Sequence, residues 1–246
     1  AVEARVAAGD DPGPLAGVPI SIKDVIWVAG AHATNGSLPY RDFHPPEDAV
    51  IVRRLRDAGA VIVGRTTNPE LCFAGVTQNQ LTGITRNPWQ LACTPGGSSG
   101  GAGASVAAGL TPLAIGSDGG GSIRIPAAFC GVAGHKPTFG LVPGTPGFRG
   151  WPSLSVKGPM ARTVRDLALT MSVIAGADPA DPATERWPDL NYPAADVSTL
   201  RVAVSADLGC APLEPGVRAC FEAAIESLAS AGWQLEEAHP PTGEPT

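Results

Sequence analysis

Short apolar runs alternate with longer helical segments along this chain. The apolar runs are bounded by glycine, proline or charged residues, as is typical of buried strands, and they cover residues 18–22, 61–64, 113–116, 201–204 and 233–237. Helical spacing or small-residue composition predicts helices between these runs, over residues 48–58, 102–108, 163–175 and 215–231. Strands that alternate with helices indicate an α/β sheet with helices packed on its faces.

The last strand–helix–strand unit, residues 201–237, begins close to the end of the chain. Only a proline-rich stretch, residues 239–246, follows it. A sheet edge that has just begun seldom ends a natural chain, so we expect a fragment of a longer protein. We interpret residues 1–246 as a single domain that lacks its C-terminal portion.

Composition narrows the classes of function. The 246 residues carry a net charge of −6 and are 43% hydrophobic, which predicts a compact globule without a basic patch for nucleic acid. No apolar run approaches the ~20 residues that span a bilayer, so we expect no membrane association. The five cysteines form no CxxC pair and are expected as free thiols in a reducing cytoplasm. The four histidines are scattered without ligand-like spacing, so neither a metal nor another cofactor is predicted.

Two glycine–serine clusters, residues 96–101 and 118–124, carry the candidate chemistry. We predict Ser122 of the second cluster as a nucleophile. The glycines before it have no Cβ, so their backbone N–H groups can converge on one point as an oxyanion hole; they are Gly119, Gly120 and Gly121. A tight turn without catalytic role is the alternative that this cluster alone leaves open.

Ser98 lies in the first cluster, 24 residues before Ser122. It is a candidate N-cap for the helix predicted at 102–108, or part of a loop that cradles a phosphate. The phosphate interpretation lacks its partners, because neither GxxxxGK[ST] nor an opening GxGxxG occurs. A cap alone would not require glycines on both sides, so a role in chemistry remains open for Ser98.

Lys23 follows the apolar run 18–22 directly. A lysine at the end of a buried strand loses hydration, which lowers its pKa and makes it a competent base. Asp118 and Arg124 flank the second cluster, and we expect them to brace that loop through an ion pair rather than act on a substrate. A lysine base with serines among glycines points to attack on a carbonyl without histidine.

Several separate blocks of the chain resemble, in order, the amidase signature family. They are residues 17–24, 96–101, 116–127, 136–140 and 158–162 with Asp166. The resemblance extends from about residue 15 to 180. It implies a mixed central sheet covered by helices on both faces.

The resemblance also implies a Ser–cisSer–Lys triad. Ser122 matches the acyl-forming nucleophile, Ser98 the bridging serine after a cis peptide, and Lys23 the base. The family's oxyanion donors fall on the backbone of residues 119–122, and Ser99 is expected to hydrogen-bond into the same network. The chain departs from the family at Gly119, where threonine is typical.

The triad that the resemblance implies predicts that the protein hydrolyses a small-molecule carboxylic amide through an acyl-enzyme. The segment 138–160, with Phe148 and Trp151, is a candidate apolar wall for the substrate. One alternative is the glutamine-hydrolysing A subunit of a tRNA-dependent amidotransferase, although a glutamine common in that subfamily is replaced here by Ile125. Another is an inactive fragment or a binding module that kept the loops. A homodimer is compatible with each of these.

Overall fold

The computed structural model describes residues 2–148, 150–184, 196 and 199–240. They divide into two compact units, Ala1–Leu190 and Asn191–Thr246, and each unit is described by itself. The extent of a single domain over residues 1–246 stays a prediction.

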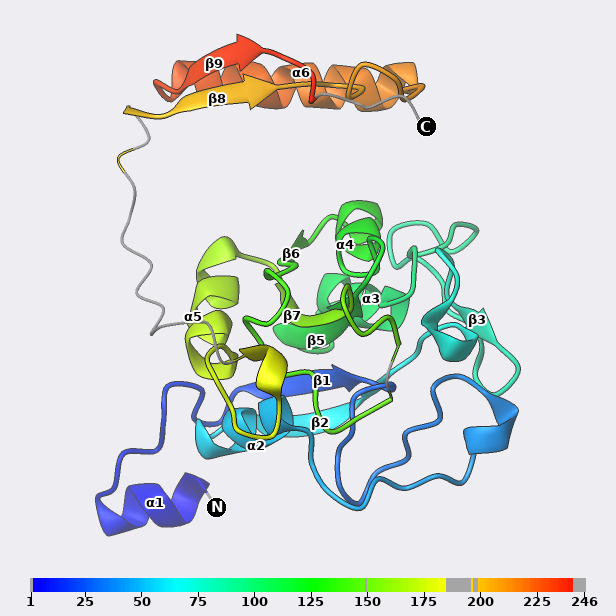
Figure 1. Ribbon diagram of the computed structural model, residues 1–246, viewed down its shortest axis with the longest axis vertical. Helices are drawn as coiled ribbons and strands as arrows, with labels where there is room; N and C mark the ends of the chain where they lie inside the picture. The colour runs from blue at the N-terminus through cyan, green and yellow to red at the C-terminus, as the bar shows by residue number, and fades with distance from the viewer. Residues whose placement is uncertain (1, 149, 185–195, 197–198, 241–246) are drawn as a thin grey trace. The chain divides into compact units, whose positions relative to one another are not determined.

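The first unit is built around a five-stranded sheet (Figure 1). Its strands are β1 (Pro19–Lys23), β2 (Val61–Thr66), β5 (Leu113–Asp118), β6 (Ala133–Gly134) and β7 (Val156–Ala161), in the order β2-β1-β5-β7-β6. The β1 strand pairs in parallel with β2 and β5, whereas β7 pairs antiparallel with β5 and β6. The predicted mixed central sheet is therefore confirmed.

The remaining elements of the first unit are helices, 3-10 turns and one short hairpin. The helices are α1 (Val2–Ala8), α2 (Val50–Asp57), α3 (Gly100–Ala107), α4 (Arg124–Cys130) and α5 (Val164–Ile174). The 3-10 turns are η1 (Leu38–Tyr40), η2 (Glu70–Cys72) and η3 (Pro182–Thr184), and the hairpin strands are β3 (Gln78–Asn79) and β4 (Gly83–Ile84).

Successive side chains of a strand point to opposite faces, and β5 shows how this produces two cores. Leu113 and Ile115 enter a core that α2 and α5 complete on one face. Ala114 enters a second core, formed with residues of α3 and α4 on the other face. Helices thus cover both faces of the sheet, as the resemblance implied.

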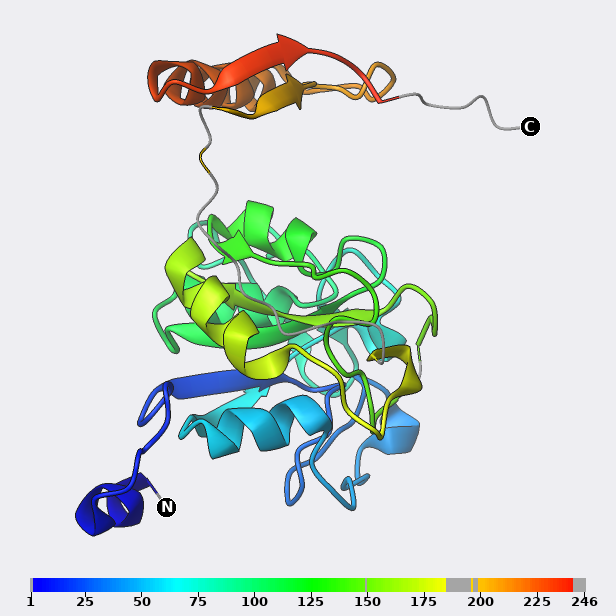
Figure 2. The same cartoon turned by 60° about the vertical axis from the view of Figure 1, so that its left-hand side comes forward.

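Helices α2 and α5 contact each other (Figure 2), and a side chain of α2 caps the end of α5. Arg54 Nη1 on α2 donates to the carbonyl oxygens of Ile174, Ala175 and Gly176 at 2.9, 2.9 and 3.1 Å. The last carbonyls of a helix lack partners within the helix, so a cation placed there stabilises its C-terminus. Arg54 therefore ties α5 to α2.

The predicted elements of the first unit are found near their expected bounds, including β2, β5 and α5. Thr163 caps α5, because its side chain accepts a hydrogen bond from Asp166 N at 3.2 Å. The β7 strand was not predicted, since Gly158 and Pro159 interrupt its pattern. The glycine is required there, because a Cβ at position 158 would lie 2.2 Å from the carbonyl oxygen of His135.

The α4 helix is the second element that the pattern did not predict. Its sequence, RIPAAFC, contains Pro126, which usually ends a helix. Pro126 lies in the first turn, where backbone N–H groups have no partner within the helix, so its missing N–H costs nothing.

The second unit contains β8 (Arg201–Val204), α6 (Pro215–Ser230) and β9 (Gln234–Glu237). The two strands pair in parallel, with Arg201 opposite Gln234. This confirms the predicted strand–helix–strand unit. Within the described residues, none of the helices has the length and apolar character that crossing a bilayer requires.

Candidate active site

Lys23 ends β1 in a fully buried position, with 0% of its surface exposed. Its ammonium nitrogen, Nζ, lies 2.6 Å from Ser98 Oγ, 3.0 Å from Ser99 Oγ and 2.9 Å from Ser117 Oγ. The first two hydroxyls come from one glycine–serine loop and the third from the end of β5. The strand end therefore brings the lysine predicted as a base to the serine predicted as its relay.

Burial lowers the pKa of Lys23 below the ordinary lysine value, because the charged form loses hydration. Cys72 and, more weakly, Asp118 oppose this shift. The three hydroxyls around Nζ are neutral, so they can hydrogen-bond the free amine as well as the ammonium. The surroundings thus favour a lysine that gives up its proton more readily than one in water.

Ser98 follows a cis peptide bond, Gly97–Ser98, as the resemblance implied. The alternative of Ser98 as a helix cap is wrong. Helix α3 begins at Gly100, the cap position belongs to Ser99, and neither hydroxyl caps the helix. The Ser98 hydroxyl is instead engaged by Lys23.

Ser99 joins the two glycine–serine loops through hydrogen bonds of its side chain and its backbone. Its hydroxyl donates to the carbonyl of Ser117 at 3.1 Å and accepts from Ser117 N at 3.2 Å. Its backbone N–H donates to the carbonyl of Ser122 at 3.0 Å. The loops that carry Ser98 and Ser122 are therefore held side by side by hydrogen bonds that are largely buried.

The loop that carries Ser122 is built around Asp118, whose carboxylate is 0% exposed. Arg124 Nε and Nη2 donate to its two oxygens at 3.0 Å each, and the amides of Gly121 and Ile123 donate at 2.7 and 3.0 Å. The expected brace of Asp118 and Arg124 is thus a bidentate ion pair. Burial raises the pKa of Asp118, but the hydrogen bonds from Arg124, Gly121 and Ile123 outweigh it and lower that pKa to about 2.

The amides of this loop are not equivalent. Gly121 N–H is donated to Asp118, and its φ of +115° places Gly121 in a conformation that residues with a Cβ rarely adopt. Within the described part of the chain, the N–H groups of Gly119, Gly120 and Ser122 have no such partner. No hydrogen bond joins Ser98 Oγ to Ser122 Oγ there either. Such bonds are often long in an enzyme without substrate and tighten when it binds.

A cavity of about 230 Å³ opens over these groups. Ser98, Ser117 and Ser122 line it together with Gly119 and Gly120. Residues 71–75 and Gly150, Trp151 and Ser155 also line it. The predicted nucleophile, the serine predicted as its relay and the two glycines therefore line one common space.

Trp151 explains why glycine is tolerated at position 119. A Cβ at Gly119 would lie 2.9 Å from Trp151 Cε3, and one at Gly120 would lie 3.4 Å from its Cζ3. The indole thus occupies the space that a side chain at 119 would fill. The departure from the family's threonine is compensated by an aromatic ring from a distant loop.

The sequence pattern predicts no role for Ser117, although this residue belongs to the block 116–127 that resembles the family. Its hydroxyl lies 2.9 Å from Lys23 Nζ and its residue lines the cavity. The available signal was a polar residue at the end of an otherwise apolar run, where parallel strands end at the same edge as Lys23. This signal at Ser117 is weak beside the run of glycines that follows it, and the glycine–serine pattern points to those glycines and Ser122.

A buried lysine and a network of serine hydroxyls thus lie together at the carboxyl end of parallel strands in a mixed sheet. This arrangement defines the class of protein. The family model Amidase matches residues 1–245, and the chain belongs to this family.

Two relatives illustrate the range of proteins that the chain resembles. It is 45% identical over 241 residues to a Glutamyl-tRNA(Gln) amidotransferase subunit from Carboxydothermus hydrogenoformans, matching 96% of this chain and 49% of that protein. It is 46% identical over 245 residues to an Acylamidase from Rhodococcus erythropolis, matching 97% of this chain and 51% of that protein.

Among solved structures, the native peptide amidase from Stenotrophomonas maltophilia has a TM-score of 0.87 and 36% identity. The match covers 97% of this chain and 51% of that one. The chain therefore spans about half the length of the relatives that it matches.

Proposed function

We propose that this chain carries the acyl-transfer centre of an amide hydrolase. The observation that carries the proposal is the contact of 2.6 Å between the buried Lys23 Nζ and Ser98 Oγ, inside the cavity wall that also presents Ser122. A lysine whose pKa is lowered by burial supplies the base that a serine nucleophile needs.

The proposed reaction begins with proton transfer. Neutral Lys23 takes the proton of Ser98, and Ser98 takes the proton of Ser122 as the Ser122 oxygen attacks the amide carbon. The amides of Gly119, Gly120 and Ser122 stabilise the oxyanion, because they have no partner within the described residues. The Gly121 amide is already donated to Asp118 and serves to shape the loop.

The carbon–nitrogen bond then breaks, and the leaving ammonia or amine takes the proton back through Ser98. Water then attacks the acyl carbon and gives a proton to Lys23 through Ser98. The bond from the acyl carbon to the Ser122 oxygen breaks as that proton passes back to Ser122, which frees the acid and restores neutral Lys23. We propose a reducing cytoplasm as the setting, which the five free cysteines favour.

Labelling with a serine-reactive fluorophosphonate, followed by peptide mass spectrometry, tests the assignment. We expect the adduct on Ser122, no adduct in Ser122→Ala, and loss of amide turnover in that variant with an unchanged unfolding transition. Ser153→Ala, at an exposed serine outside the cavity, is the matched control and is expected to label normally. Full turnover by Ser122→Ala would exclude Ser122 as the nucleophile.

A second candidate is glutamine hydrolysis in an amidotransferase, favoured by the 45% identity to a protein with that name. The same centre would release ammonia from glutamine for a partner protein. The two candidates are separated by comparing ammonia release from glutamine with release from simple aliphatic amides. Glutamine turnover that requires a co-purified partner would favour the second candidate.

A further inference from the structure

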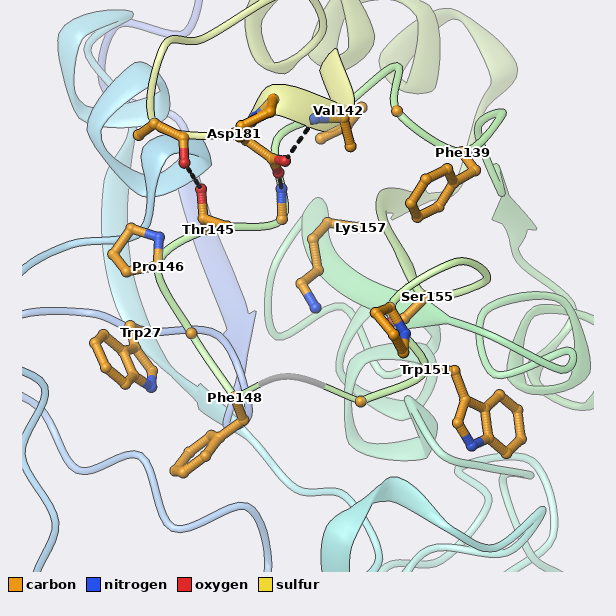
Figure 3. A pocket seen from close by; sticks show the side chains of 18 residues that line it. Trp27, Phe139, Val142, Thr145, Pro146, Phe148, Trp151, Ser155, Lys157 and Asp181 are labelled. Atoms are coloured by element: carbon orange, nitrogen blue, oxygen red, sulfur yellow. Dashed lines mark hydrogen bonds between the residues drawn. The ribbon is translucent and has the colours of Figure 1, made fainter.

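A second cavity, of about 490 Å³, is larger than the first and is drawn in Figure 3. Its walls include aromatic side chains, among them Trp27, Phe139, Phe148 and Trp151. Gly150, Trp151 and Ser155 line both cavities, so they form the boundary between the two spaces. An amide held at Ser122 would therefore have this aromatic chamber next to it.

Among the described residues that line this chamber, Lys157 is the cation. Its residue is only 8% exposed, yet Figure 3 shows its amine directed into the open space between Phe148 and Ser155. Within the described residues, this amine has neither a hydrogen bond nor an ion pair. A buried charge without a partner is costly, so this ammonium favours the binding of an anion, to which it can donate hydrogen bonds.

The position of Lys157 follows from strand register. It lies directly opposite Ser117 in the antiparallel pair of β5 and β7, so both side chains leave the sheet on the same face. Ser117 Oγ in turn lies 2.9 Å from Lys23 Nζ. The register thus places a second buried lysine two strands away from the proposed catalytic base, with β5 between them.

Among the described residues that line this chamber, Asp181 is the carboxylate, and each of its oxygens accepts a backbone N–H group. Oδ2 accepts from Gly144 N at 2.7 Å, and Oδ1 accepts from Ala183 N at 3.2 Å. In Figure 3 it lies toward the loop at Thr145, away from the Lys157 amine. No ion pair joins Asp181 to Lys157, so Lys157 has no direct counter-ion among the residues that the structure describes.

Burial lowers the pKa of Lys157 to about 8, with Cys72 and Asp181 raising that pKa and Lys23 lowering it. At neutral pH most of the protein thus keeps the Lys157 ammonium charged. The aromatic walls can contact the hydrocarbon part of a ligand, and the Lys157 ammonium can bind the anionic end of the same ligand. Cavities of this kind bind ligands through many apolar contacts and a few oriented polar ones.

We propose that this chamber selects amides that carry a carboxylate remote from the reacting bond, with Lys157 as its ionic partner. The inference rests on the proposed amide hydrolysis at Ser122 and names the class of its substrate. The carboxylate stands either on the acyl side, as in the monoamide of a dicarboxylic acid, or on the amine side, as in an N-acyl amino acid. Both place an anion beyond the boundary at Trp151.

Steady-state kinetics on matched substrates test this. The full chain is assayed with monoamides from succinamic to suberamic acid, with N-acetyl amino acids of increasing length, and with uncharged alkyl amides of the same lengths. We expect a carboxylated series to exceed its uncharged match in kcat/KM. In Lys157→Met that series should lose about 10- to 100-fold, the value of a charge-assisted hydrogen bond, while the uncharged series changes by less than about threefold.

Lys136→Met is the matched control, because Lys136 lines neither cavity. It should leave both series unchanged. Equal losses on charged and uncharged amides in Lys157→Met would overturn the inference, and so would a wild-type protein that prefers the uncharged series. Failure to hydrolyse any amide would instead refute the proposed function.

A binding measurement does not depend on the Lys157 variant folding. In Ser122→Ala, titration calorimetry with adipate and with hexanoate compares a dianion with a monoanion of the same length. N-acetyl-6-aminohexanoate and N-acetylhexylamine make the same comparison for the amine side. We expect at least about tenfold tighter binding of the more highly charged member in one pair. Equal affinities in both pairs would overturn the proposal.

Discussion

Asp118→Asn tests whether the loop that carries Ser122 is held by a buried charge. The native carboxylate accepts from both Arg124 nitrogens and from the amides of Gly121 and Ile123. Asparagine keeps the shape but loses the charge, and it replaces one acceptor oxygen by an NH₂ donor. One of the facing N–H donors is then left without an acceptor, which is costly in a buried site.

The magnitude follows from the pKa of Asp118. Its fall from the ordinary 3.8 to about 2 corresponds to about 2 kcal/mol of folding free energy, at about 1.4 kcal/mol per pH unit. The pKa is depressed in the folded state, so this stabilisation is complete well above pH 3.8 and is lost as the pH falls through about 2. At pH 3 the Asp118 carboxyl is already mostly protonated in the unfolded state, so the folded state has lost about 1 kcal/mol of this stabilisation.

Urea unfolding of the full chain at pH 7 and pH 3 measures both effects. We expect Asp118→Asn to lower the unfolding free energy by about 2–3 kcal/mol at pH 7, and by about 1 kcal/mol less at pH 3. Asp42→Asn, at an exposed aspartate, is the control and should change stability by less than about 0.5 kcal/mol at either pH. A loss below about 0.5 kcal/mol at pH 7, or the same loss at both values, would refute this account.

Three further predictions concern the base, the loop and the helix tie. Amide hydrolysis should rise with pH and level off below pH 10.5, because burial lowers the pKa of Lys23 from that value and only the neutral amine accepts a proton; a constant rate from about pH 5 to 9 would contradict it. Gly119→Thr should destabilise the fold by about 1–3 kcal/mol through contact with the indole, and a double-mutant cycle with Trp151→Ala should recover most of that loss. Arg54→Met should lower the unfolding free energy by about 1–3 kcal/mol, since it leaves the carbonyls at the end of α5 without a donor; Arg53→Met, at a more exposed neighbour, should have a smaller effect in the same urea titration.

The local pattern of the chain was sufficient for much of the fold. Apolar runs and helical periodicity predicted β1, β2, β5 and α5, because these elements bury one face or a whole run and their patterns are uninterrupted. The pattern failed for β7 and α4, where Gly158, Pro159 and Pro126 carry conformations or close contacts that only neighbours explain. The mixed direction of the strands came from the family resemblance rather than from periodicity, and the order in which they pair came only from the structure.

The sequence by itself determined which groups could react: Lys23 after an apolar run, and Ser98 and Ser122 among glycines. Only the tertiary structure decided how they meet. It placed Ser117 beside Lys23 and used the Gly121 amide to hold Asp118. It also placed the Trp151 ring where a side chain at position 119 would lie. The Lys157 side chain points into a second cavity. The physical reason is that periodicity shows only which side of a helix or strand is buried. Contacts between distant residues depend on strand register and on loop conformation, which the local sequence pattern does not specify.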